Sequence, residues 1–191
     1  MLLKVEKAFD KFADLIGAVT SMAIVLMIMN VTYDVVMRYF FKSGSIAFQE
    51  MEWHLFSVVI LLGMAYTLKE DGHVRVDLIY DRLSPNKKAM INMIGVVTFI
   101  YPLAILIGLA SVPFVVETFQ SGEISGDPGG LTHRWIVKAL IPLSFLLLFI
   151  TATGYFIKNL NTYRGLHKME EHGIKEEIEA IKSSIHKEET K

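Results

Sequence analysis

The chain has 191 residues, of which 52% are hydrophobic and 20% are charged, and its formal net charge is -1 at pH 7. The charged residues fall in blocks between long apolar runs, which is typical of a polytopic membrane protein. A net charge so close to zero does not indicate a nucleic-acid partner. The chain contains no cysteine, which excludes disulfides, thiolate metal sites and a cysteine nucleophile.

The first segment, residues 1–14, carries apolar side chains at helical spacing with charged side chains of both signs between them. This pattern predicts an amphipathic helix that lies on the membrane surface and leads into the first span. A frayed, solvated N-terminus is the alternative. The mixed charges and the lack of a small-residue cleavage site do not fit a cleaved signal peptide.

Four stretches are apolar enough to cross a bilayer. The first is free of charged residues from Leu15 to Tyr33, and at about 1.5 Å per residue this run alone is roughly 28 Å long, close to the hydrocarbon thickness. The third is longer than a bilayer requires and is expected to be tilted or to extend beyond the hydrocarbon core. Pro102 and Pro113 are expected to kink it. The predicted spans are about 15–40, 49–68, 87–116 and 136–157, so the transmembrane domain covers 15–157 and the fold class is an all-α membrane protein with peripheral amphipathic helices.

Two peripheral segments complete this plan. The connection between the second and third spans predicts a short helix on the membrane surface, followed by a helix start at Ser84 and Pro85. The charged tail, residues 158–191, repeats isoleucine with steps of four, three and four from Ile174 to Ile185. Such a stripe predicts a partly helical tail that forms a short coiled coil, a helix docked on its own protein, or a helix that forms only with a partner.

Lysine and arginine residues predict the orientation, because cytoplasmic loops are enriched in them. The N-terminal segment, the middle loop and the near part of the tail hold twelve, whereas the other two loops hold four. Both termini are therefore predicted to be cytoplasmic, and the 37–52 and 117–138 loops are predicted to face outward.

A polar stripe borders the first span. Asn30, Asp34 and Arg38 are four residues apart and therefore share one helix face, and Glu50 and His54 repeat that spacing after a short turn. The stripe fits either a substrate or ion path, or an ion pair that fixes helix packing. Glu50 and His54 fit either a proton relay, or a helix start that is solvated or binds a neighbouring subunit. Glu52 points to the opposite side of the same helix.

Catalytic and cofactor motifs are not apparent in the sequence. A haem-binding bundle needs two facing histidines, and only His54 lies in or beside a span at a useful depth. No phosphate-binding, dinucleotide-binding, zinc-protease or nucleophile-elbow pattern is present. We therefore expect no enzyme activity, no cofactor and no metal site.

Several short motifs occur in order across the four spans. They are Asn30 with Arg38-Tyr39, Glu50-x-Glu52-Trp53-His54, Leu61-Leu62-Gly63-x-Ala65-Tyr66, Gly72-His73-Val74-Arg75-Val76-Asp77, Gly122-Glu123-Ile124-Ser125, Asp127-Pro128-Gly129-Gly130-Leu131 and Arg134-Trp135-x-x-Lys138. In this order and spacing they resemble the small membrane subunit of tripartite ATP-independent periplasmic (TRAP) transporters, the DctQ-type family. The likeness covers about residues 15–157, and its later part is similar to the mannitol/chloroaromatic branch.

The resemblance implies a multi-pass protein of the bacterial inner membrane that binds a large membrane subunit and helps to receive a periplasmic substrate-binding protein. It implies an accessory role in sodium-driven uptake of an organic acid or a related solute. A membrane-anchor subunit of a redox enzyme is the alternative, and a free-standing small channel or carrier is a third interpretation. The candidate partner-interface residues are Asn30, Asp34, Arg38, Glu50, Glu52, His54, Gly63, Glu123 and Asp127.

Overall fold

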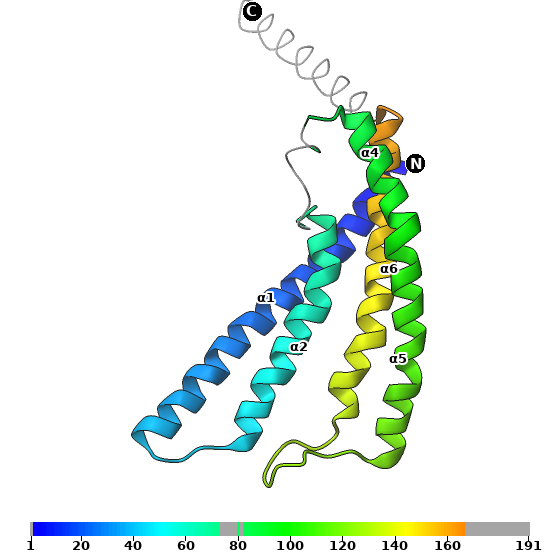
Figure 1. The fold of residues 1–191 in the computed structure, drawn as a ribbon. Helices are drawn as coiled ribbons and strands as arrows, with labels where there is room; N and C mark the ends of the chain where they lie inside the picture. The colour runs from blue at the N-terminus through cyan, green and yellow to red at the C-terminus, as the bar shows by residue number, and fades with distance from the viewer. Residues whose placement is uncertain (1, 73–79, 81, 167–191) are drawn as a thin grey trace, which may run out of the picture.

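The computed structural model describes residues 2–72, 80 and 82–166, and these residues form helices, turns and loops without strands. Four continuous helical stretches are long and apolar enough to cross a membrane, which confirms the all-α, four-span prediction. In chain order the elements are α1 (Leu2–Phe40), α2 (Ile46–Lys69), α4 (Pro85–Gly95), the π-helical turn η1 (Val96–Ile100), α5 (Tyr101–Ser121) and α6 (Trp135–Tyr163), as Figure 1 shows.

The four stretches form two antiparallel hairpins. Residues 41–45 join α1 to α2, and residues 122–134 join α5 to α6. Both connections lie at one end of the molecule, which we call the hairpin-loop end; the N-terminus and the end of α6 lie at the opposite, termini end (Figure 1). The hairpins meet mainly where α2 packs on α6, and α1 also contacts α6. Figure 1 shows that the two hairpins diverge toward the hairpin-loop end.

The π-helical turn has a local cause in the sequence. Proline lacks an N–H, and its ring clashes with the carbonyl of the residue four positions earlier in a regular α-helix. Pro102 stands two residues after η1, and the N–H of Tyr101 bonds the carbonyl of Val96, five residues back. The wider turn therefore accommodates the proline within one continuous helix.

Two glycines allow helices to approach closely. A Cβ added to Gly17 of α1 would lie 2.5 Å from the ring of Tyr66 in α2. A Cβ added to Gly154 of α6 would likewise lie 2.5 Å from the Cβ of Phe9 in α1. Glycine is therefore required at both crossings for steric reasons.

The outside of the bundle is strongly apolar. Met22, Phe99 and Leu106 are 65%, 75% and 69% exposed, and similar side chains cover all four helices. A continuous apolar surface of this kind is unfavourable in water but fits the hydrocarbon of a bilayer. The buried residues form two small clusters along the α1–α2–α6 and α2–α5–α6 contacts, around Leu62 and Phe145.

The helices differ in extent from the predicted elements. Residues 2–14 are not a separate helix but the first turns of α1, since no glycine or proline interrupts the segment. The predicted spans 49–68, 87–116 and 136–157 lie within longer helices, and α6 continues to Tyr163. Most of the predicted surface helix in the 69–88 connection and the isoleucine stripe of the tail lie outside the described residues.

Candidate functional site at the hairpin-loop end

The predicted polar stripe of α1 lies beside the start of α2. The side-chain amide of Asn30 donates to the carbonyl of Phe48 over 2.9 Å, and the Tyr33 and Phe48 rings are 4.8 Å apart. Asp34 is 4% exposed and forms an ion pair with Arg38, whose side chain is 48% exposed. The pair therefore joins a buried acid to an accessible base, and Asn30 ties α1 to α2.

Glu50 makes a different set of contacts, to the connection between α5 and α6. Its Oε2 accepts from the backbone N–H of Leu131 over 2.6 Å, and its Oε1 accepts from the hydroxyl of Ser125. A Cβ at Gly130 would lie 2.8 Å from the same carboxylate, so the loop backbone packs directly on Glu50. The structure thus brings Asp34 and Arg38 together, while Glu50 joins the first hairpin to the second.

Lys138 fixes the same loop from α6. Its Nζ lies 2.5 Å from Glu123 Oε2 and 2.9 Å from Thr118 Oγ1, and 4.1 Å from the centre of the Phe114 ring. The hydrogen bond from Lys138 holds the pKa of the Glu123 carboxyl below its ordinary value, because it stabilises the charged form. Arg134 adds a weaker contact, with its Nε 3.8 Å from Glu123.

The other predicted residues are less connected. Glu52 is half-buried and makes no hydrogen bond or ion pair within the part of the chain that the structure describes. His54 has a buried Nδ1 without a hydrogen-bond partner among the described residues. Gly63 is a packing position, since a Cβ there would lie 3.7 Å from Thr20 of α1. Asp127 is exposed in the loop, where its N–H donates to the Ser125 hydroxyl.

A second polar network holds the termini end together, and its residues are not among those predicted from the sequence. Asparagine side chains within or beside the apolar runs could have indicated this network in the sequence, because a buried amide requires a hydrogen-bond partner. Four contacts link different helices or the turn after α2: Asn161 to Glu6 at 2.6 Å, Lys69 to Asp14 at 2.5 Å, Tyr155 to Asp71 at 2.5 Å and Asn92 to Asn159 at 2.9 Å.

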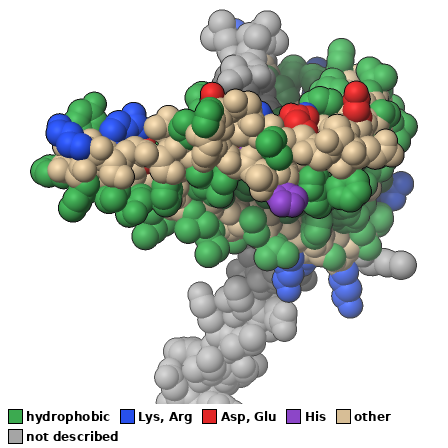
Figure 2. Space-filling view, turned by 90° about the horizontal axis from the view of Figure 1, so that it is seen from below, with side chains coloured by type: hydrophobic (Ala, Val, Ile, Leu, Met, Phe, Trp, Pro, Cys, Tyr) green, Lys and Arg blue, Asp and Glu red, His purple; other side chains and the backbone are tan. Residues whose placement is uncertain are grey.

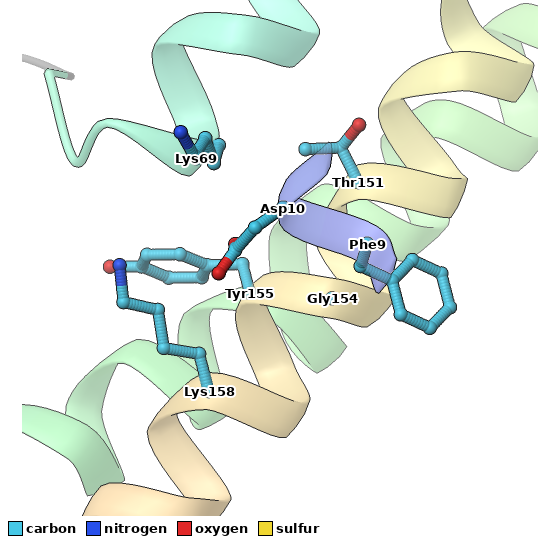
Figure 3. Close-up of a pocket in the computed structure, with 7 residues that line it drawn as sticks. All are labelled: Phe9, Asp10, Lys69, Thr151, Gly154, Tyr155 and Lys158. Carbon is cyan, nitrogen blue, oxygen red and sulfur yellow. The ribbon is translucent and has the colours of Figure 1, made fainter. Parts of the chain in front are cut away.

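Figure 3 shows a void within this second network. Side chains from α1, α2 and α6 surround it, including Asp10, Lys69 and Lys158. Its volume is about 10 Å³, which is room for one water molecule. The termini end is therefore a packed polar contact between helices and has no space for a solute at this position.

Catalytic or metal-binding geometry is not evident within residues 2–72, 80 and 82–166. No group of three or more His, Asp or Glu side chains in these ranges could hold a metal ion. The described polar groups instead tie helices to each other and fix the 122–134 loop. Together with the apolar exterior, this arrangement defines a polytopic helical membrane protein whose polar groups organise helix contacts and one exposed loop.

The comparison with protein families identifies the particular kind of membrane protein. Residues 27–162 match the family described as tripartite ATP-independent periplasmic transporters, DctQ component. The chain belongs to this family, and it is a TRAP transporter small permease subunit and a multi-pass protein of the bacterial inner membrane. The match gives no support to the redox-anchor alternative.

Curated relatives carry corresponding names. Two proteins of Haemophilus influenzae named as TRAP transporter small permease proteins are similar to this chain. One is 27% identical over 133 residues, covering 69% of this chain and 83% of its own length. The other is 23% identical over 154 residues, covering 80% and 91%. The C4-dicarboxylate TRAP transporter small permease protein DctQ of Pseudomonas aeruginosa is 29% identical over 154 residues, covering 73% and 68%.

Proposed function

We propose that this chain is the accessory subunit of a secondary transporter that imports an organic acid or a related solute with a sodium gradient. It enlarges the membrane scaffold of a large subunit, and its hairpin-loop end helps to receive a periplasmic substrate-binding protein. The observation that carries this proposal is the 122–134 loop. Glu50 of α2 accepts a hydrogen bond from the loop backbone, and Lys138 of α6 pairs with the side chain of Glu123, so the loop is held from two different helices and presents a defined outer surface.

The exposed part of the loop suits a contact with a soluble protein. Ile124 is 61% exposed, and Asp127, Pro128 and His133 are also exposed. A loop held in one conformation loses little entropy on binding, which favours association. The Asp34–Arg38 pair lies on the other hairpin, where the accessible guanidinium of Arg38 is suited to contact the large subunit.

The decisive experiment is a double-mutant cycle at Asp34 and Arg38, with co-purification of the large membrane subunit as the readout. Removing one partner of a buried pair costs about 3–5 kcal/mol, whereas an exposed pair contributes about 1 kcal/mol or less. Arg38→Ala should therefore weaken assembly, and Asp34→Ala should act non-additively with it. Solute affinity of the separate binding protein should stay unchanged.

A matched control is Lys42→Ala, which removes an exposed cation at the same end of α1. We expect this variant to retain full assembly. If Arg38→Ala assembles fully but no longer couples uptake to sodium, the scaffold role is wrong and a transport site lies in this chain.

A further inference from the structure

A pocket of about 340 Å³ opens at the hairpin-loop end between α2, the 122–134 loop and the first turn of α6. This volume is at the lower end of the roughly 300–1,000 Å³ that is usual for small-ligand sites. Its lining is charged toward the loop, through Glu50, Asp127 and Arg134, and it includes the apolar side chains of Trp53 and Val137 on α2 and α6. The pocket is therefore amphipathic along the helices.

Two groups of opposite charge are available in this pocket. The Asp127 carboxylate is exposed and has no hydrogen bond or ion pair within the part of the chain that the structure describes. The Arg134 side chain is 42% exposed, and its ion pair among the described residues is the 3.8 Å contact with Glu123. Glu50, by contrast, already accepts two hydrogen bonds from the loop. Figure 2, which views this end, shows charged side chains of both signs rather than a patch of one sign.

An aromatic side chain continues the pocket toward the bilayer. Trp53 lines it and is 69% exposed, and its ring meets that of Phe56 edge-on at 6.3 Å. Phe56 and Ile60 are 44% and 50% exposed, and the spacing of the three residues places them on one face of α2. An exposed apolar stripe thus runs from the pocket along the membrane-spanning helix.

We propose that this pocket binds the headgroup of a zwitterionic phospholipid with a primary ammonium group, that is, phosphatidylethanolamine. The ammonium pairs with Asp127 and lies against the face of Trp53, which favours cations. The phosphate pairs with Arg134, whose planar guanidinium matches phosphate oxygens. One acyl chain follows Phe56 and Ile60 into the membrane. This assignment is independent of the proposed transport role.

Charge and shape favour this lipid over other ligands. An anionic lipid without an ammonium group would bring its phosphate near Glu50 and Asp127 with no compensating cation of its own. A choline headgroup carries the positive charge but has no N–H to donate to the Asp127 carboxylate. A lysine side chain from a protein partner would satisfy Asp127 but would leave Arg134 and the apolar stripe without a counterpart.

The test uses the full chain with Trp135→Phe, which leaves Trp53 as the only tryptophan, since the sequence has two. The protein is placed in phosphatidylcholine vesicles, and Trp53 fluorescence is titrated with lipids that carry bromine on the acyl chains. Brominated phosphatidylethanolamine should quench Trp53 at about fivefold lower mole fraction than brominated phosphatidylcholine or phosphatidylglycerol, the preference expected for exposed ion pairs.

Two variants and one control decide the outcome. Asp127→Asn should reduce the preference toward one, because Asp127 is the group that accepts from the ammonium. Arg134→Gln should instead weaken quenching by all three lipids, because each of them carries the phosphate. Glu117→Gln, an acid-to-amide change at an exposed site of α5 outside the pocket, should leave both properties unchanged. Equal quenching by all three lipids, a preference that survives in Asp127→Asn, or unchanged quenching in Arg134→Gln would overturn the proposal. Loss of the preference when the large membrane subunit is reconstituted with the chain would assign the pocket to that protein instead.

Discussion

At the scale of single residues, Glu50 is the described side chain that links the first hairpin to the 122–134 loop through hydrogen bonds. Glu50→Ala removes both acceptors, so the N–H of Leu131 should exchange with deuterium severalfold faster while the spans remain folded. Glu52→Ala is the matched control, because Glu52 is an acid two positions along α2 that makes no described hydrogen bond. Equal exchange at Leu131 in the two variants would show that the loop does not depend on Glu50.

Glu123 makes the same loop sensitive to acid. Its pKa is lowered from the ordinary 4.5, mainly by the hydrogen bond from Lys138. A lowered folded-state pKa means that the ionised group stabilises the fold above pH 4.5 and that this contribution is lost as pH falls through the lowered value. In a Trp53→Phe chain, the emission of Trp135, whose ring lies 5.3 Å from Phe119, should therefore change only below pH 4.5.

The control for this titration is Glu123→Gln, which cannot ionise and should lack the acid-dependent change. An identical transition in the two chains would assign the acid response to another group. A midpoint above the ordinary pKa would contradict the direction of the shift.

The contacts of these residues differ in how far the sequence could predict them. The Asp34–Arg38 pair follows from a spacing of four on one helix, and the structure contains it. Glu50 meets Ser125 and Leu131 across separations of 75 and 81 residues, which depend on how two hairpins cross. The spacing of polar and apolar residues describes one helix at a time. It could therefore indicate that Glu50 needs a partner, but it could not indicate which loop supplies that partner.

At the scale of helices, apolar run length predicted the four spans well, because the cost of exposing the backbone and charges to lipid acts locally. The continuity of α1 was harder to predict. Its first turns look amphipathic, and the buried Glu6 accepts a hydrogen bond from Asn161, which lies 155 residues away in the sequence. Packing against α6 thus explains a charge pattern that also fits a helix on the membrane surface.

Gly154 tests that packing. Gly154→Ala would place a Cβ 2.5 Å from Phe9, and overpacking of this kind costs about 1–3 kcal/mol. Gly95→Ala is the matched control, since a Cβ at that helical glycine meets nothing within 4 Å and alanine favours helix by up to about 1 kcal/mol. Because the chain has no cysteine of its own, Glu6→Cys and Asn161→Cys can be combined to form a disulfide between α1 and α6. The yield of this disulfide should fall when Gly154→Ala is added and should not fall when Gly95→Ala is added. Unchanged yield and unfolding free energy would disprove the close contact.

At the scale of the whole molecule, the two ends are held differently. Interhelical polar contacts near Glu6, Lys69 and Asn159 draw the helices together at the termini end, whereas the hairpins diverge at the hairpin-loop end, as Figure 1 shows. Glu50 provides the described polar link across that divergence. This asymmetry leaves the pocket near Asp127 open and exposes the 122–134 loop, the two features on which the proposals for lipid and binding protein rest.

The orientation of the molecule in the membrane can be tested directly. Gly44 and Gly126 belong to the two connections at the hairpin-loop end. Lys4 lies in the first turns of α1 and Arg164 directly follows α6, and these helix ends lie at the termini end (Figure 1). The excess of Lys and Arg at the termini end predicts that it is cytoplasmic. Single cysteines are readily introduced because the chain has none, and a Cβ at Gly44 or Gly126 meets nothing within 4 Å. A membrane-impermeant maleimide should label cysteines at 44 and 126 in intact spheroplasts, and one at 164 only after permeabilisation. The reverse pattern would invert the molecule and place the Glu50-bound loop in the cytoplasm, where it could not meet a periplasmic binding protein.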